Sequence, residues 1–578
     1  MKKKRILLVY PKIPPTYWSF KYALPFIRKK AAYPPIGLLT VAALLPDYYD
    51  IELIDMNVSS LEDDAIISSD LVMVSAMMVQ KKAFSTITKR CNKMGVPIAA
   101  GGPYPTSSFK KIEGVNHFIL NEAEVTMHEF IDDFEKGCAR NVYMSEQKAD
   151  ITSSPPPRFD LINLNDYATM ALQYSRGCPF NCEFCDIIEL FGRKPRLKKN
   201  EQFIHELELL YDAGWRGALF VVDDNFIGNK KRVKGLLKDI SLWQRDKKYP
   251  FNLFTEASID LSEDKELLSL MAEAGFNMVF VGIETPDEDT LRKVNKQQNV
   301  RHKGLINNIL EIKKYGIEVS GGFIVGFDTD TPDIFDRQIE FIQESGIPSA
   351  MVGLLTALPN TQLYRRLLKE GRLLKDSSGN NTHDLYLNFK PKMDIDMIIN
   401  GYKKIISSIY DPMKYFERCL TFLRSVNPAP HSCRKVGLNE LYYFFSSLVR
   451  QSFSAYGYYY IKFLMKALVI KPKMFPEAVR LAIVGHHLLK ITKEILAVDA
   501  FKMYIEKIRE FYLKKVTDFE KFDFEAHLRL KDSILLDLKK KYNKLHKDFR
   551  HLAEESFTSI EYLIESYSLH YMPSKSTR

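Results

Sequence analysis

The sequence predicts an α/β protein with two successive β/α regions followed by a helical C-terminal part. Short apolar runs alternate with helical patterns over residues 1–145 and again over 171–365. Such alternation is typical of parallel sheets. We therefore expect a doubly wound, Rossmann-like first region and a full or partial (β/α) barrel as the second. From about residue 430 the pattern is helical and rich in aromatic residues.

Length and composition indicate several globular domains. The chain has 578 residues, 46% of them hydrophobic and 27% charged, which is too long for one domain and apolar enough for several cores. The segments we expect are a Rossmann-like domain at 1–145, a linker at 146–170, a barrel at 171–365, a helical subdomain at 366–428 and a helical extension at 429–578.

Charge and cysteine content exclude some classes of protein. The net charge is +10, and no compact basic module follows the barrel, so no nucleic acid partner is expected. The basic start is followed by only about five apolar residues, which indicates a strand and not a signal peptide. No uncharged apolar run reaches the ~18 residues of a membrane span; the closest approach, 441–470, is interrupted by Arg450, Lys462 and Lys466. Seven cysteines, three of them clustered, suit a metal site in a reducing cytoplasm.

The first region has unusual residues where its strands end. The strands expected are Ile6–Tyr10, Ile51–Asp55, Leu71–Ser75, Pro97–Ala100 and His117–Leu120. Met77, Met78 and Gln80 follow the third strand, and Gly101-Gly102 follows the fourth. Parallel sheets bind ligands at these carboxyl ends. No Gly-x-Gly-x-x-Gly follows the first strand, so a dinucleotide site of that type is not supported.

Polar residues also end the strands of the second region. The strands expected are Met170–Tyr174, Ala218–Val222, Asn252–Thr255, Met278–Val281, Val319–Val325 and Ala350–Leu355. Asp224 and Asn225 follow the second of these, and Glu256 and Ser258 follow the third. Function gathers at this end of a (β/α) barrel, so these side chains are candidates for one site.

The stretch with the clearest chemistry follows the first barrel strand. Cys178, Cys182 and Cys185 stand in a Cys-x3-Cys-x2-Cys spacing. Three thiolates can hold three irons of a [4Fe–4S] cluster and leave the fourth iron open. Structural zinc normally has four ligands, and the nearest further candidate is His205. Unliganded, buried thiols are the third interpretation, which the polar neighbours Arg176 and Asp186 disfavour.

The helical tail shows no catalytic constellation. Tyr442–Phe445 and Tyr458–Phe463 place large apolar side chains on amphipathic helices, for which core packing is the default interpretation. The alternatives are a groove for an apolar substrate or docking on a membrane surface. His486 and His487 are adjacent, so they point to different sides of a helix, and we interpret them as structural.

These motifs together resemble those of radical S-adenosylmethionine (SAM) enzymes that carry a cobalamin-binding domain before the barrel. The first region is similar to that domain at Tyr33–Leu39, Asp70–Ser75, Gly101–Pro103 and Asn121–Glu124. Val222–Asn229, Gly322–Asp328 and Asn388–Pro391 are similar to the subgroup that includes the hopanoid C-2 methylases. The likeness covers residues 4–425 closely and the tail only loosely.

The resemblance implies three cofactors: a [4Fe–4S] cluster, SAM and cobalamin. The three cysteines would ligate the cluster, whose open iron SAM would chelate. The residues implied for SAM are Tyr174, Asp224, Asn225, Glu256, Ser258, Glu284, Gly322, Ile324 and Gly326. Those implied for cobalamin are Ser75, Met77, Met78, Gln80, Gly101, Gly102, Tyr104, Asn121 and Glu122.

The sequence departs from related patterns at two places. The Asp-x-His-x-x-Gly motif, whose histidine binds cobalt from below in cobalamin mutases, is not found. Met77, Met78 and Gln80 are therefore candidates for the lower side of the corrin. Many radical SAM barrels carry Glu at the end of Gly-x-Ile-x-Gly-x-x-Glu, where this chain has Thr329 between Asp328 and Asp330.

The implied reaction begins with cleavage of SAM to a 5′-deoxyadenosyl radical, which takes hydrogen from an unactivated carbon. Methyl transfer from methylcobalamin to a lipid or other apolar metabolite is the function we expect. Rearrangement, cyclisation or C–C coupling needs the same motifs and stays open as the alternative. The other expected partners are an electron donor such as flavodoxin or ferredoxin and, for the C-terminal helices, the membrane surface.

Overall fold

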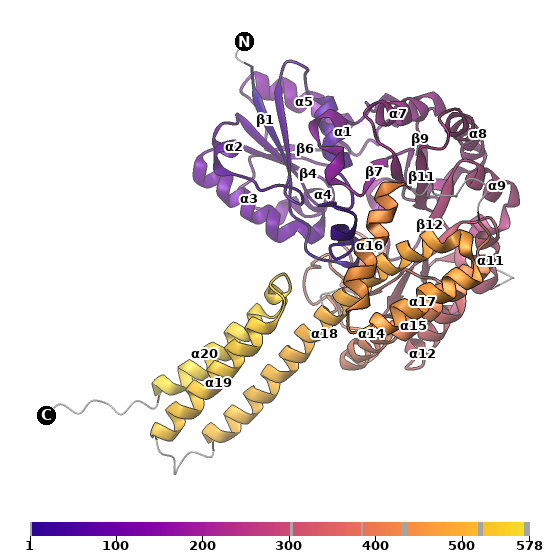
Figure 1. Ribbon diagram of the computed structural model, residues 1–578. Coiled ribbons are helices and arrows are strands. Elements are labelled where there is room, and N and C mark those ends of the chain that lie inside the picture. The colour runs from indigo at the N-terminus through magenta and orange to yellow at the C-terminus, as the bar shows by residue number, and fades with distance from the viewer. Residues whose placement is uncertain (1–2, 301–303, 383–384, 429–436, 518–523, 571–578) are drawn as a thin grey trace. The chain divides into compact units, whose positions relative to one another are not determined.

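The computed structural model describes residues 3–300, 304–382, 385–428, 437–517 and 524–570, and its N-terminal part is a six-stranded parallel sheet. The strand order is β2-β1-β3-β4-β5-β6. Figure 1 shows this sheet, with β1, β4 and β6 labelled, in the indigo to violet N-terminal part of the chain. The strands are β1 (Arg5–Tyr10), β2 (Asp50–Asp55), β3 (Leu71–Ser75), β4 (Ile98–Gly101), β5 (His117–Ile119) and β6 (Val142–Tyr143). The five expected strands are confirmed. The sixth has only two residues, too few to produce an alternating pattern.

Helices cover both faces of this sheet because its strands are apolar on both sides. Phe84 and Ile87 pack on one face with Val72 and Val74, and Leu38 and Phe130 pack on the other with Ile6 and Leu8. The helices are α1 (Ile36–Leu44), α2 (Asp63–Ile67), α3 (Lys81–Met94), α4 (Pro103–Ser108) and α5 (Ala123–Glu135). The doubly wound fold is thus confirmed.

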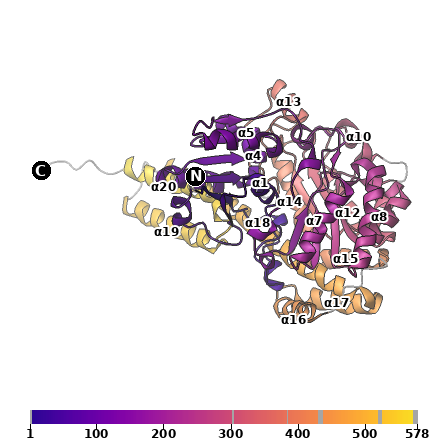
Figure 2. The same cartoon turned by 90° about the horizontal axis from the view of Figure 1, so that it is seen from above.

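The second sheet is a partial barrel. Its six parallel strands lie in chain order, β7 to β14, so β7 and β14 form the two edges of the described sheet. The strands are β7 (Thr169–Leu172), β10 (Gly217–Val221), β11 (Phe251–Glu256), β12 (Phe276–Glu284), β13 (Glu318–Val325) and β14 (Ala350–Leu354). The helices between them are α7 (Asn200–Asp212), α8 (Lys230–Asp246), α9 (Lys265–Glu273), α10 (Glu288–Lys293), α11 (Leu305–Lys314) and α12 (Ile334–Ser345). Figure 2 shows α7, α8 and α12 along the outside of this sheet.

The cysteine loop lies between β7 and α7. The two-residue strands β8 (Ser175–Arg176) and β9 (Arg196–Leu197) pair antiparallel and close the base of the loop. The short helix α6 (Ile187–Leu190) follows the third cysteine. The sequence pattern did not predict this hairpin, since two residues per strand carry no periodicity.

The C-terminal part is helical, as expected. Its helices are α13 (Gln362–Lys369), α14 (Ile395–Ile409), α15 (Pro412–Ser425), α16 (Leu438–Ser452), α17 (Gly457–Ile470), α18 (Phe475–Thr517), α19 (Phe524–Lys544) and α20 (Glu554–His570). Arg480 of α18 forms an ion pair with the buried Glu318 of β13, which ties the beginning of α18 to the barrel. Among the described helices, none is both long and apolar enough to cross a membrane.

Internal contacts divide the chain into two compact units, Met1–His487 and Leu488–Arg578. The first unit contains both sheets and the helices through the beginning of α18. The second unit holds the rest of α18 with α19 and α20, where Tyr542 stacks on Phe557 with ring centroids 4.3 Å apart. The finer domain boundaries at 145, 170, 365 and 428 stay predictions.

Candidate active site

The three cysteines lie on a tight loop whose backbone the sequence constrains. Gly177 has φ +93°, and a Cβ atom there would stand 2.8 Å from the carbonyl oxygen of Gly192. Only glycine fits this position, directly before the first cysteine. The amide of Cys178 donates to the same Gly192 oxygen at 3.2 Å. Cys182 is buried, whereas Cys178 and Cys185 are half-buried.

Polar groups from two barrel loops reach the cysteine sulfurs. The Nδ2 of Asn225 lies 3.9 Å from the Sγ of Cys178. The Nε2 of Gln298 lies 3.4 Å from the Sγ of Cys182. Burial raises the pKa of the Cys178 and Cys185 thiols. Metal binding requires these thiols in the deprotonated form, which donors and positive charge near the sulfurs favour.

Lys296 supplies positive charge next to the cysteines. Its Nζ lies 2.6 Å from Oε1 of Glu284. Burial acts against the charged form of Lys296, but Glu284 and Cys182 outweigh it and raise the pKa of the ammonium group. Glu284 has φ +66°, a strained conformation for a non-glycine residue. A Cβ at Gly282 would lie 2.3 Å from the Glu284 carboxylate, so glycine there leaves room for the pair.

Asp223 and Asp224, which follow β10, hold the cysteine loop against the barrel. Asp223 accepts hydrogen bonds from the amide of Tyr174 at 2.8 Å and the hydroxyl of Ser175 at 2.6 Å. Asp224 accepts from the amide of Gly177 at 2.7 Å. Burial raises the pKa of Asp223 to about 7 and that of Asp224 to about 6.

Asn225, Ser258 and Glu256 meet beside this loop. The Nδ2 of Asn225 donates to the hydroxyl of Ser258 at 3.1 Å. Burial, with the nearby charge of Asp224, raises the pKa of Glu256 to about 8. No described residue forms a hydrogen bond or ion pair with the Glu256 carboxylate. Partly buried acidic groups with raised pKa values are suited to a cationic ligand, and SAM carries a sulfonium and an ammonium group. These residues therefore fit SAM.

The end of β13 is organised by its acidic residues. Asp330 accepts hydrogen bonds from the amides of Gly326 and Phe327 at 2.7 and 3.0 Å. Asp328 forms ion pairs with Arg366 and Arg372. Both carboxylates thus have protein partners. Gly322 and Ile324 lie on this strand and are partly exposed, as a ligand-facing position requires.

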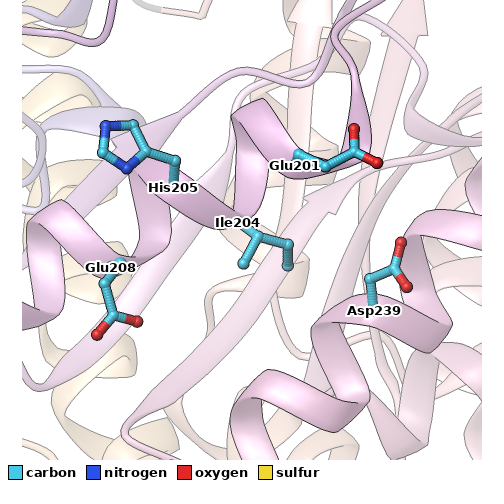
Figure 3. Close-up of a pocket in the computed structure, with 5 residues that line it drawn as sticks. All are labelled: Glu201, Ile204, His205, Glu208 and Asp239. Atoms are coloured by element: carbon cyan, nitrogen blue, oxygen red, sulfur yellow. The ribbon is translucent and has the colours of Figure 1, made fainter.

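Tyr174 and His205 lie away from the cysteine sulfurs. The ring of Tyr174 packs edge-on against Phe203 and Phe226, in the core beneath the loop. His205 lies on α7 in a shallow groove on the outer helices, lined also by Glu201, Ile204, Glu208 and Asp239 (Figure 3). Among the described residues, no group of three or more His, Cys, Asp or Glu side chains converges on one metal ion. A cubane cluster does not require such convergence, because its cysteines bind separate irons.

Some of the residues implied for cobalamin are open at the carboxyl edge of the first sheet. Ser75, Met78, Gly101 and Gly102 are partly exposed there, and the Met77 side chain is exposed. This edge is where parallel sheets bind ligands, so these five residues fit the group.

The other four residues implied for cobalamin have protein partners. Buried Gln80 donates to the carbonyl of Pro11 at 2.6 Å and accepts from the amide of Met77 at 2.8 Å. Tyr104 is buried against Phe84. The side-chain amide of Asn121 donates to the Ser145 carbonyl at 2.7 Å. Glu122 forms ion pairs with arginines of the cysteine hairpin, described next.

Arg176 joins the two sheets. It stands two residues before Cys178, and its guanidinium contacts Glu122 at 2.9 Å and Glu124 at 2.7 Å, both just beyond β5. Arg196, from the opposite strand of the hairpin, also contacts Glu122 at 2.9 Å. Burial acts against ionisation of Glu124, but hydrogen bonds and charge from Arg176 outweigh it and hold the pKa of this carboxyl below its usual value. The candidate cobalamin edge is thereby fixed to the cysteine loop.

Comparison with known proteins identifies the family. Residues 172–342 match the model of the radical SAM superfamily, and 361–499 match a domain of unknown function, DUF4070. An uncharacterized methyltransferase of Synechocystis sp. is 42% identical over 416 residues, 72% of this chain and 77% of the relative. Hopanoid C-2 methylase of Rhodopseudomonas palustris is 35% identical over 420 residues, 72% and 78% of the two chains. The chain belongs to the radical SAM superfamily, in the family that includes hopanoid C-2 methylase.

Solved structures confirm the fold of this radical SAM enzyme. The radical SAM methyltransferase TsrM of Kitasatospora setae, with cobalamin and a [4Fe–4S] cluster bound, has a TM-score of 0.54 at 14% identity and covers 83% of this chain and 99% of its own. The cobalamin-dependent enzyme OxsB has a TM-score of 0.56 at 14% identity and covers 97% and 84%. The first sheet therefore has the fold of the domain that precedes the radical SAM core in these two proteins. As a member of the superfamily, the chain uses a [4Fe–4S] cluster and SAM.

Sequence reasoning missed several residues of the site. Gln298 and Lys296 reach the cysteines from more than a hundred positions away, and their spacing gives no signal. Arg176 could have been found, because an arginine beside a metal-binding loop and two acidic residues at a strand end form a complementary set.

The first prediction concerns Arg176. Replacing it in Arg176→Met leaves Glu124 buried without its cation, which should lower the free energy of unfolding by about 3–5 kcal/mol. Arg158→Met is the matched control, because Arg158 pairs with exposed Asp160 and should cost less than about 1 kcal/mol. Denaturant unfolding followed by circular dichroism measures both. Equal losses in the two variants would contradict the role given to Arg176.

Proposed function

We propose that this enzyme transfers a methyl group to an unactivated carbon of a lipid or other apolar metabolite. When bound, the cluster and SAM supply a carbon-centred radical, and cobalamin supplies a transferable methyl group. The observation that carries the proposal is the Arg176 link, because it fixes the cobalamin-type domain beside the cysteine loop. Both cofactors are then held where one substrate carbon can meet them.

The chain's own residues have distinct tasks in this proposal. Cys178, Cys182 and Cys185 hold the cluster, with Asn225 and Gln298 donating toward their sulfurs. Asp224 and Glu256 favour the positive charge of SAM, and Ser258 and Glu284 lie beside them. Gly322 and Ile324 of β13, which are partly exposed, face the adenine, whereas Gly326 is buried. Ser75, Met77, Met78, Gly101 and Gly102 face the corrin.

An electron donor completes the proposal. Reductive cleavage of SAM needs one electron, which the chain itself does not supply, so a flavodoxin- or ferredoxin-like carrier is required as a partner. Cys178 and Cys185 are half-buried, which leaves the cluster loop near the protein surface and accessible to such a carrier.

The second prediction tests methyl transfer. Reconstituted protein, incubated without oxygen with reductant, cobalamin and SAM labelled with deuterium in its methyl group, should form 5′-deoxyadenosine and S-adenosylhomocysteine together. Hopanoids are the first lipids to offer, since a relative is named for acting on them. Mass spectrometry should find the labelled methyl group in the product. If SAM is cleaved and the substrate is converted to a product without the labelled methyl group, the result would instead support rearrangement, cyclisation or coupling.

We also propose that helices α16 and α17 dock on anionic membrane. Five exposed apolar residues of α16 and its C-terminus recur every three or four positions and so form one stripe: Leu438, Leu441, Phe445, Val449 and Phe453. On α17, Tyr458, Met465, Leu468 and Val469 are also exposed, beside exposed Lys462 and Lys466. The default of core packing thus holds for Tyr460 and Phe463 but not for these residues.

The charged residues of α16 and α17 indicate that this face binds an anionic partner. Between residues 437 and 476 the chain has five basic residues, Arg450, Lys462, Lys466, Lys471 and Lys473, and one acidic residue, Glu440. Apolar stripes flanked by cations are typical of helices that lie in the interface of anionic bilayers. A lipid substrate would be reached from the same surface.

The third prediction is binding to vesicles. The protein should cosediment with phosphatidylglycerol-rich vesicles, and less so at high salt because the attraction is partly electrostatic. The variant Leu441→Ser/Phe445→Ser/Val449→Ser should bind at least about tenfold more weakly. Ile67→Ser/Leu242→Ser changes two exposed apolar residues elsewhere and should bind like wild type. If the triple variant binds vesicles as well as wild type, this face does not dock on the membrane.

A further inference from the structure

Helix α13 packs directly on the cysteine loop. The side-chain amide of Gln362, the first residue of α13, donates to Oδ1 of Asn181 at 2.7 Å. The amide of the next residue, Leu363, donates to the carbonyl of Glu183 at 2.9 Å. These two contacts lie on either side of Cys182. One hydrogen bond and one peptide unit therefore separate the start of α13 from a residue that holds the cluster.

The carboxylates that α13 contacts each have an arginine partner. Arg365 pairs with Glu189 of the cysteine loop at 2.8 Å. Arg366 pairs with Glu183 at 2.5 Å and with Glu370 at 3.2 Å. Because these acidic groups are compensated, the other cations of the region determine the charge of its surface.

The exposed side of α13 combines cations with an apolar residue. Between residues 361 and 375 the chain has five basic residues and one acidic residue. Lys369 is exposed, and its neighbour Leu368 is 60% exposed. Figure 2 shows α13 at the outer edge of the view. An apolar centre with a charged rim is the arrangement of surfaces that bind proteins.

The cysteine loop adds two exposed cations to this surface, Arg193 and Lys194. Nη2 of Arg193 donates to the carbonyl of Pro179 at 3.4 Å, directly after Cys178 in the chain. Glu189, which pairs with α13, is four residues before Arg193. The cations of the loop and those of α13 therefore border the same part of the cysteine loop.

We propose that Arg193, Lys194, Leu368 and Lys369 form the docking surface for an acidic flavodoxin-type electron carrier. The proposal rests on the proposed function, in which each cleavage of SAM consumes one electron. Carboxylates of the carrier would pair with the cations, and the apolar benzene edge of its flavin would contact Leu368. Complementary charge speeds the encounter and fixes the orientation of the two proteins. One electron passes from the reduced flavin to the oxidised cluster, and no bond forms or breaks in that step.

This surface also gives a task to the start of the domain of unknown function. The match to that domain covers residues 361–499, and α13 is its first helix. Of the residues that α13 contributes, Leu368 and Lys369 face solvent, whereas Leu363 and Leu367 are buried. The buried residues fix the helix, and the exposed ones are available to a partner.

Binding of a purified flavodoxin tests the surface directly. Reconstituted full-length protein is immobilised without oxygen, and surface plasmon resonance should show saturable binding that weakens with salt. The variant Lys194→Glu/Leu368→Ser/Lys369→Glu should bind at least about tenfold more weakly. The control Lys231→Glu/Lys238→Glu/Leu242→Ser makes the same changes at exposed positions of α8 and should bind like wild type.

Three results of this experiment would overturn the proposal. They are the absence of flavodoxin binding to wild type, equal binding by wild type and the α13 variant, and tighter binding of a [2Fe–2S] ferredoxin than of flavodoxin. The last result would assign the surface to a carrier without a flavin.

Reduction of the cluster provides the second arm. Stopped-flow absorbance compares the rate of cluster reduction by reduced flavodoxin with the rate by dithionite, a small reductant that needs no docking surface. The ratio of the two rates should fall at least about tenfold in the α13 variant and keep its wild-type value in the α8 control. Because both rates are measured on the same cluster, the ratio separates docking from damage to the site.

The two arms also separate this proposal from the proposed function. If the α13 variant keeps the wild-type ratio of rates, the docking surface is wrong although methyl transfer stands. If flavodoxin reduces the wild-type cluster through this surface but no labelled methyl group reaches a product, the proposed function fails and the docking surface stands.

Discussion

The buried contact between Arg176 and the carboxylates of Glu122 and Glu124 is the interaction on which the arrangement of the site depends. A guanidinium in this position can be satisfied only if the end of β5 lies beside the cysteine hairpin, because an uncompensated buried charge is costly. Arg196 repeats the contact from the other strand of the hairpin. These ion pairs thus hold the carboxyl edge of the first sheet next to the loop that carries the three cysteines.

The residues around the thiols share a second constraint, which is backbone space. A side chain at position 177 would clash with the Gly192 carbonyl, so only glycine fits there. A side chain at position 282 would have to displace the ends of the Glu284 and Lys296 side chains. Asp223 and Asp224 then fix the loop through main-chain amides. The carboxylate of Glu256 has no such task among the described residues, which is why we assign it to a ligand.

The sequence predicted most of what depends on local pattern. Eleven expected strands are present, and Asp224 and Asn225 contact the loop that carries the cysteines, with Ser258 bonded to Asn225. The sequence did not predict whether side chains at the strand ends point toward a ligand or into the protein core. Gln80, Tyr104 and Tyr174 follow or end strands as expected, yet they turn into packing and hydrogen bonds, because residues at a strand end can serve the fold or a ligand equally well. Gln298 reaches the cysteines only through tertiary folding, which no spacing encodes.

The central claim is that three cysteines hold a [4Fe–4S] cluster whose fourth iron binds SAM beside the carboxylates. Electron paramagnetic resonance of the reduced, reconstituted protein tests it most directly. We expect the signal of a reduced [4Fe–4S] cluster whose g values shift when SAM is added. In Glu256→Gln the same cluster signal should remain, with the shift appearing only at higher SAM concentration. A cluster signal that SAM leaves unchanged at every concentration would contradict the account.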